Sequence, residues 1–213
     1  KSGYTSSTQS ATVTANGTTT LNFTLSVQAT EKVLYGDMET FFSTGWADNC
    51  GGHTSKLPGA SFANWGWNNT SGFPFNTWDS TSIRHAGSHA LGFNFCQTAA
   101  SPGKMGIVYQ SVNLGAANAT ATFSAWGYHT DGNCPTIMCW NPGSGQADPA
   151  VAYSAGRYQW ICTDNWGQVN TWQNRTMTVT ADSSGYVTIM VGGAAHTGTP
   201  GSTPLYIDDV SVK

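Results

Sequence analysis

The chain has 213 residues, enough for one sizeable domain plus an extra element, and only 9% of them are charged, against an ordinary value of ~25%. The formal net charge is −3, and without a basic patch nucleic acid is not an expected partner. No apolar run approaches the ~20 residues of a spanning helix, so we expect no membrane insertion.

Two Thr-rich alternating runs open the chain, at residues 10–14 and 19–27. They flank Asn16-Gly17, and Asn-Gly between such runs predicts a β-hairpin because both residues tolerate positive φ. One face of the second run carries an apolar stripe of Leu21, Phe23, Leu25 and Val27. A lone hairpin is marginal in water. We therefore expect residues 1–29 to dock onto a neighbouring domain or an identical subunit.

Residues 2–25 resemble the last strands of a carboxypeptidase-regulatory-like domain, a small transthyretin-like β-sandwich found upstream of secreted bacterial enzymes. About the final third of such a domain would be present. Because no signal peptide precedes Lys1, we expect a mature or trimmed piece of a longer secreted protein.

Residues 30–213 are expected to form one larger β-sandwich. Sustained 3.6-residue periodicity is missing, so we expect no more than about a tenth of the residues in helix. Many short strands with Gly- and Pro-rich turns favour a sandwich. The expected strands are 90–95, 106–114, 119–128, 171–172, 175–180, 186–191 and 205–213. Residues 50–80 form a long insertion rich in Gly, Pro and Trp.

Six short motifs follow one another along the chain. They are Gly36-Asp-Met-Glu39, Gly45-Trp46, His85-Ala-Gly-Ser-His-Ala-Leu91, Tyr109-Gln110, Phe123-Ser-Ala-Trp126 and Tyr206-Ile-Asp-Asp-Val210. In this order, over residues 34–212, they resemble the galactose-binding-like jelly roll of secreted carbohydrate-binding modules, although Met38 replaces a residue that is often aromatic. The resemblance implies an all-β jelly-roll β-sandwich and a non-catalytic module.

Two acidic pairs, Asp37 with Glu39 and Asp208 with Asp209, lie near opposite ends of this region. Consecutive strand residues point to opposite faces, so one aspartate of the second pair should face inward or towards a neighbouring segment. A buried carboxylate needs a partner, and hard oxygen ligands suit Ca²⁺. We predict a structural calcium site that joins the first strand region to the last. The alternative is that the aspartates cap strand ends or accept hydrogen bonds from a loop.

Nine tryptophans suggest a sugar-binding platform, because indole faces stack on sugar rings and are costly to expose without purpose. The predicted ligand-binding residues are Trp65, Trp67, Trp78, Trp140, Trp166 and Asn68, all placed in loops. Alternatively, these rings pack the loops onto the sandwich. We expect Trp46, Trp126 and Trp172 to be structural, and His85 to make a structural hydrogen bond rather than to ligate a metal.

Five cysteines, Cys50, Cys96, Cys134, Cys139 and Cys162, suggest disulfides and an oxidising compartment, with one thiol left over. We favour Cys50 with Cys96, and Cys134 with either Cys139 or Cys162. The sequence thus predicts a non-catalytic extracellular module of a larger secreted or surface protein that binds a glycan or polysaccharide or serves adhesion. The alternative is a subunit of an extracellular filament assembled by β-strand addition through the N-terminal hairpin.

Overall fold

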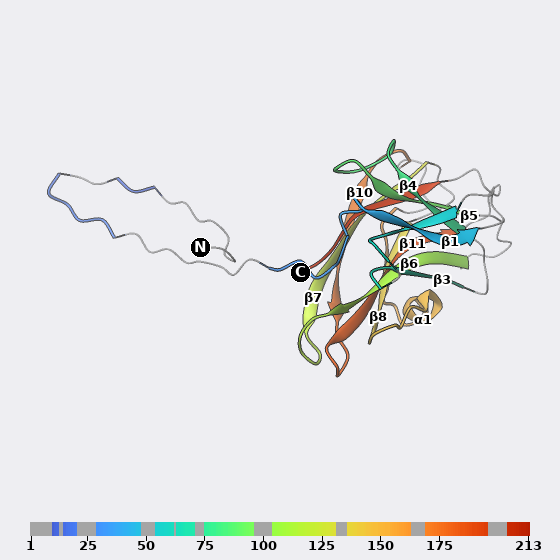
Figure 1. Cartoon of the computed structure of the whole chain (residues 1–213). Coiled ribbons are helices and arrows are strands. Elements are labelled where there is room, and N and C mark those ends of the chain that lie inside the picture. The colour runs from blue at the N-terminus through green and yellow to red at the C-terminus, as the bar shows by residue number, and fades with distance from the viewer. Residues whose placement is uncertain are drawn as a thin grey trace.

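The computed structural model describes residues 10–12, 15–20, 29–47, 54–61, 63–70, 75–95, 104–130, 136–162, 169–195 and 204–213. In these ranges the chain forms two five-stranded sheets, one two-stranded ribbon and a single short helix (Figure 1). Among the described residues, no helix is long and apolar enough to cross a membrane.

The two large sheets are antiparallel throughout. The first sheet, which we call the front sheet, has the order β10 (Gln173–Thr180), β7 (Thr120–His129), β12 (Leu205–Val212), β5 (Ala90–Phe95), β4 (Phe75–Ser80). The second sheet, which we call the back sheet, has the order β3 (Gly66–Asn69), β6 (Lys104–Asn113), β11 (Tyr186–Ala195), β8 (Thr136–Pro142), β9 (Tyr158–Trp160). From β5 to β8 and again from β10 to β12, successive strands alternate between the sheets. The predicted all-β jelly-roll β-sandwich is therefore confirmed.

Period-two alternation builds the core between the sheets. In β12, Leu205 and Ile207 point inward and are fully buried. In β11, Val187, Ile189 and Val191 share the inward face, as the sequence predicts. The residues between these positions therefore face outward, and on the front sheet that outward face carries the candidate site.

From its Gly and Pro content, we expected the insertion at residues 50–80 to be a long loop. Its described residues instead form short strands. It contributes β3 and β4 to the two sheets, and β2 (Thr54–Pro58), which pairs with β1 (Phe41–Ala47) in the ribbon. Short strands flanked by turn residues escaped prediction because their alternation covers only a few positions.

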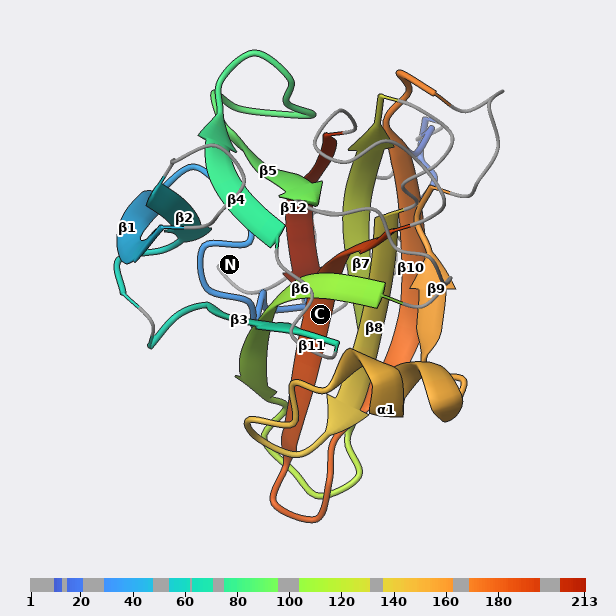
Figure 2. The same ribbon diagram turned by 90° about the vertical axis from the view of Figure 1, so that its right-hand side faces the viewer.

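The outer face of the back sheet is covered by α1 (Pro149–Ser154), which lies in front of this sheet in Figure 2. Asp148 caps the helix, since its Oδ1 accepts from Ala150 N at 2.8 Å and from Val151 N at 3.3 Å, and a proline follows directly. Ala152 packs on Ile107, Cys139 and Met190 of the sheet. This face is therefore partly occupied by the chain itself.

The predicted cysteine pairing is wrong where it can be checked. Cys139 and Cys162 are free thiols, fully buried in different apolar clusters. Burial raises the pKa of Cys139 to about 12 and that of Cys162 to about 11, so both stay protonated. Cys50, Cys96 and Cys134 lie outside the described residues, and the Cys50–Cys96 pairing stays a prediction.

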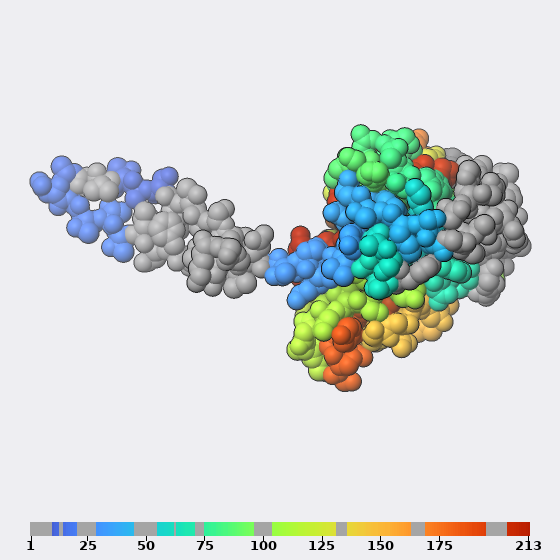
Figure 3. Space-filling model, in the orientation of Figure 1, coloured from blue at the N-terminus to red at the C-terminus, as the bar shows by residue number. Residues whose placement is uncertain are grey.

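The described residues of the N-terminal segment lie apart from the sandwich (Figure 3). Its described parts, residues 10–12 and 15–20, are exposed and form no strand, although Asn16 has a φ of 65° in a turn. The apolar stripe of the predicted hairpin, at residues 21–27, lies outside the described part of the chain. The docking role of residues 1–29 and their likeness to a transthyretin-like domain therefore stay predictions.

Candidate functional site

A row of aromatic side chains crosses the outer face of the front sheet. The strand register aligns Trp78 with Gly92, Gly92 with Tyr206, and Tyr206 with Tyr128. Each of these residues alternates with inward-facing core positions, such as Leu91, Phe93, Leu205 and Ile207. We call the complete set the aromatic strip: Trp78, Tyr206, Tyr128, Trp172, His85 and Trp126.

The rings of the strip form an unbroken chain of contacts. Ring centroids lie 5.8 Å apart between Trp78 and Tyr206, 5.7 Å between Tyr206 and Tyr128, and 5.4 Å between Tyr128 and Trp172. His85 then lies 5.6 Å from Trp172 and stacks on Trp126 at 3.7 Å with an interplanar angle of 17°. The separations of 5.4–5.8 Å are those of favourable aromatic pairs, and the His85–Trp126 stack is closer still, so the rings support one another's positions.

Glycine at position 92 allows Trp78 to lie on the sheet. A Cβ atom at Gly92 would come within 2.3 Å of Cε2 and 2.6 Å of Nε1 of the Trp78 indole. One ring face therefore covers the backbone of β5, and the indole remains partly exposed. A flat, partly exposed indole backed by a β-strand is suited to stack on an apolar ring face of a ligand.

Polar, uncharged side chains lie beside the strip. Strand alternation places Asn76, Asn94, Ser124, Asn174 and Thr176 on the same outer face. The Tyr128 hydroxyl donates to Asn170 Oδ1 at 3.1 Å. Burial, and secondarily Tyr128, raises the pKa of Tyr206. The face thus combines stacking surfaces with amides and hydroxyls that can exchange hydrogen bonds with a neutral ligand.

The tryptophans predicted to bind ligand are mostly placed elsewhere. Trp65 is 0% exposed and its Nε1 donates to the Leu34 carbonyl at 2.8 Å, so it is a core residue and the prediction for it is corrected. Trp67, in β3, packs edge-on against Phe75 at 6.1 Å. Trp140 lies in β8 of the back sheet, with the Arg157 guanidinium 5.6 Å from its ring centroid.

The other predicted ligand residues are also separated by the fold. Asn68 Nδ2 donates to the Ala147 carbonyl at 2.7 Å, on the back sheet's side. Trp166 lies outside the described residues. Of the predicted set, Trp78 belongs to the strip, and it lies in β4 rather than in a loop. Trp126 and Trp172, which we expected to be structural, also belong to the strip.

The acidic pair in β12 sits on a β-bulge. Asp208 aligns with Trp126 but Ser211 aligns with Ser124, so β12 has one extra residue, and Asp209 has a φ of 47°. Asp208 is 0% exposed and faces the neighbouring segment at residues 85–86, which is the second of the two orientations expected from the sequence. The bulge lets both carboxylates reach residues 85–86, and the buried Asp208 accepts from backbone N–H groups of His85, Ala86 and Asp209 at 2.9, 3.2 and 2.8 Å.

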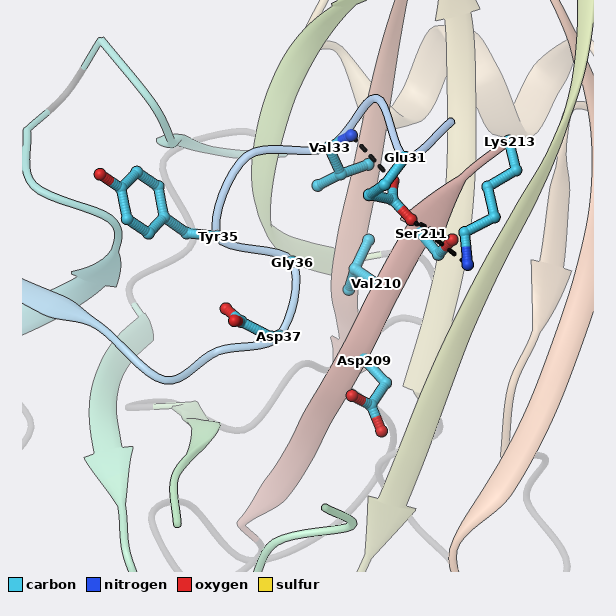
Figure 4. Close-up of a pocket in the computed structure, with 9 residues that line it drawn as sticks. All are labelled: Glu31, Val33, Tyr35, Gly36, Asp37, Asp209, Val210, Ser211 and Lys213. Carbon is cyan, nitrogen blue, oxygen red and sulfur yellow. Dashed lines mark hydrogen bonds and ion pairs between the residues drawn. The ribbon is translucent and has the colours of Figure 1, made fainter. Parts of the chain in front are cut away.

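The residues predicted to bind calcium do not form a coordination sphere in this arrangement. Asp37 and Asp209 line a cavity of about 300 Å³ beside β12, but their carboxylates point away from each other (Figure 4). Asp37 Oδ1 accepts from Glu39 N, and Glu39 Oε1 accepts from Ser88 N and His89 N. In the described part of the chain, no group of three His, Cys, Asp or Glu is placed to hold a metal. Calcium binding stays a prediction from the sequence.

The buried carboxyl of Asp208 makes stability depend on pH. Burial raises its pKa to about 6, against the opposing effect of the N–H groups of His85 and Ala86. A folded-state pKa above the unfolded value means that the proton is held more tightly in the folded state. The resulting stabilisation is complete below the ordinary pKa near 3.8 and is lost as the pH rises through about 6.

We therefore expect the free energy of unfolding of the wild type, relative to Asp208→Asn, to increase when the pH falls from about 7 to about 5. Urea denaturation of both proteins at several pH values measures this difference. Subtracting the variant's free energy of unfolding from that of the wild type cancels the contribution of the exposed carboxylates, which both proteins share. A difference that is constant over this range would contradict the assignment.

No family model and no curated protein matches the chain. Similar solved structures include TmCBM61, described in complex with β-1,4-galactotriose, at 16% identity, with 71% of this chain and 89% of that chain covered and a TM-score of 0.47. A C-terminal family 22 carbohydrate-binding module of Clostridium thermocellum Xyn10B has 18% identity, coverages of 68% and 84%, and a TM-score of 0.43. The enzymatically active domain of tailspike protein 4 from bacteriophage CBA120 has 10% identity, coverages of 71% and 19%, and a TM-score of 0.44.

Proposed function

We propose that this chain is a non-catalytic carbohydrate-binding module that binds a glycan across the aromatic strip. The observation that carries the proposal is the continuous contact of aromatic rings from Trp78 on β4 to Trp172 before β10. This path crosses the whole front sheet, so it suits an extended chain of sugars rather than a single compact ligand. A module of this kind fits a larger secreted or surface protein, where it would hold that protein on a polysaccharide.

Stacking is the physical basis of the proposed affinity. Sugar rings present apolar C–H faces that pack on aromatic rings, while their hydroxyl groups need hydrogen-bond partners. The strip supplies the rings, and Asn94, Asn174 and Asn170 supply amides on or beside the same face. No Lys or Arg occupies an outward position of the five front strands as the structure describes them, so a neutral glycan is the expected class.

Among the residues that the structure describes, we find on this face no free pair of carboxylates of the kind that glycoside hydrolysis uses. General acid and nucleophile carboxyls lie on either side of the scissile bond, with about 5–9.5 Å between them. Asp208, on β12, borders the strip. Its carboxylate is fully buried and accepts hydrogen bonds from three backbone N–H groups. Its neighbour Asp209 is paired with His85 at 2.7 Å. These contacts support binding without catalysis.

Titration with a panel of neutral and acidic polysaccharides tests the proposal. We expect binding of at least one neutral glycan, and a loss of affinity of tenfold or more for Trp78→Ala, because a central stacking residue carries a large share of binding energy. Trp140→Ala is the matched control, since Trp140 lies in the back sheet, and it should retain wild-type affinity. Binding that is unchanged in Trp78→Ala, or abolished in Trp140→Ala, would place the site elsewhere.

A further inference from the structure

The segment between β4 and β5 crosses the outer face of β12 at one end of the aromatic strip. We call residues 81–89 the strap. It is braced internally, because Ser80 Oγ donates to the Ile83 carbonyl at 3.0 Å and Arg84 Nε donates to the Gly87 carbonyl at 3.1 Å. The strap brings His85 onto the indole of Trp126, so its position sets where the strip ends.

Carboxylates from the beginning and from the end of the sandwich's sequence hold the strap. Glu39 Oε1 accepts from Ser88 N at 2.8 Å and from His89 N at 3.2 Å. Asp208 Oδ2 accepts from His85 N and Ala86 N, and Asp209 Oδ2 is 2.7 Å from His85 Nδ1. Of the five consecutive backbone N–H groups at residues 85–89, all but that of Gly87 thus donate to side-chain oxygens.

Gly87 shows how closely Glu39 approaches the strap. A Cβ atom at this position would overlap Glu39 Oε1, at 1.9 Å, and Gly87 also has a φ of 59°. Only glycine combines this backbone conformation with room for the carboxylate. The strap is therefore shaped around Glu39, a residue that lies just before β1.

We propose that the carboxylates of Glu39, Asp208 and Asp209 hold the strap directly, by hydrogen bonds and without a metal ion, and that Glu39 is a positioning residue for the aromatic strip. Three of the four acidic residues predicted from the sequence to bind calcium, all but Asp37, act instead as hydrogen-bond partners of the strap. Through the strap, Glu39 keeps His85 stacked on Trp126. The effect on ligand binding rests on the proposed function, whereas the effect on His85 does not.

Three variants of the full chain separate this role from general stabilisation. Glu39→Ala removes both acceptor contacts, and Glu39→Gln keeps a side-chain oxygen that can accept from the same N–H groups. Glu31→Ala is the matched control, because Glu31 Oε1 accepts from Val33 N and Val212 N, away from the strap. It removes a carboxylate from the same stretch of chain without touching residues 81–89.

The first readout is the nuclear Overhauser effect between the His85 ring and the Trp126 indole. We expect it in the wild type, Glu39→Gln and Glu31→Ala, and expect its loss in Glu39→Ala. The second is affinity for the glycan selected by titration, which should fall about tenfold in Glu39→Ala and be restored in Glu39→Gln; such a change corresponds to one or two net hydrogen bonds. The third is the melting temperature of the wild type, which should be the same in calcium and in EDTA.

Each readout can overturn a separate part of the proposal. An Overhauser effect that persists in Glu39→Ala would show that Glu39 does not position His85. A melting temperature that falls in EDTA and recovers with calcium would show that a metal holds the carboxylates. If the wild type binds no glycan, the proposed function fails, and the first and third readouts still decide how the strap is held.

Discussion

Replacing Trp65 by alanine should lower the free energy of unfolding by about 3–5 kcal/mol, the usual cost of truncating a buried aromatic residue. Trp65 is fully buried, and its indole nitrogen donates to the Leu34 carbonyl. The same carbonyl accepts from Gln110 Nε2 at 3.0 Å, and Gln110 also bonds to the Asn64 carbonyl at 2.9 Å. The substitution would leave a cavity. It would also remove one of the two hydrogen bonds to the Leu34 carbonyl, which links the first residues of the sandwich to β6.

Trp172→Ala is the control for this prediction. Because Trp172 is partly exposed on the outer face, its replacement should lower the free energy of unfolding by less. Urea denaturation of the two variants beside the wild type measures both changes. Trp65→Ala should also retain glycan binding under conditions in which it is folded. If Trp65→Ala were as stable as the wild type but unable to bind, Trp65 would be a ligand residue and its placement in the core would be wrong.

Gly92→Ala should reduce glycan affinity as strongly as Trp78→Ala, although it leaves every ring of the strip in the sequence. A methyl group at position 92 would lie 2.3 Å from the Trp78 indole, so the ring must rotate away from β5. Its contact with Tyr206, now at a centroid distance of 5.8 Å, would be lost with it. We expect a loss of tenfold or more by titration calorimetry.

A double-mutant cycle supplies the control. In a Trp78→Ala background, Gly92→Ala has no ring to displace and should cause little further loss, so the two effects should be strongly non-additive. Additive losses would mean that Gly92 affects binding through the sheet itself. Full affinity in Gly92→Ala alone would mean that Trp78 does not need its position on β5.

The fold was largely predictable because inward and outward residues alternate in the long strands. Val187, Ile189 and Val191 show this pattern clearly, and β11 lies where they predict it. Strands of four to six residues within the insertion, such as β3 and β4, show too few alternations to stand out from turns. Helix α1 was not predicted, because its six residues are too few to show helical periodicity.

The candidate site was harder to predict because its members come from strands that are distant in sequence. Trp126-Gly-Tyr128 and Tyr206 alternate with core residues, which marks them as outward-facing, but only the sheet order β7-β12-β5-β4 brings them together with Trp78. The bulge at Asp209 was also not apparent, since the strand pattern alone assigns adjacent aspartates to opposite faces.

The indole N–H signals in a ¹H–¹⁵N spectrum test the central claim most directly, because the chain's nine tryptophans report from different parts of the fold. Titration with the glycan selected by screening should shift the signals of Trp78 and Trp172 and leave those of Trp65 and Trp140 in place. Shifts confined to Trp140 or Trp67, with Trp78 and Trp172 unaffected at saturation, would contradict binding across the aromatic strip.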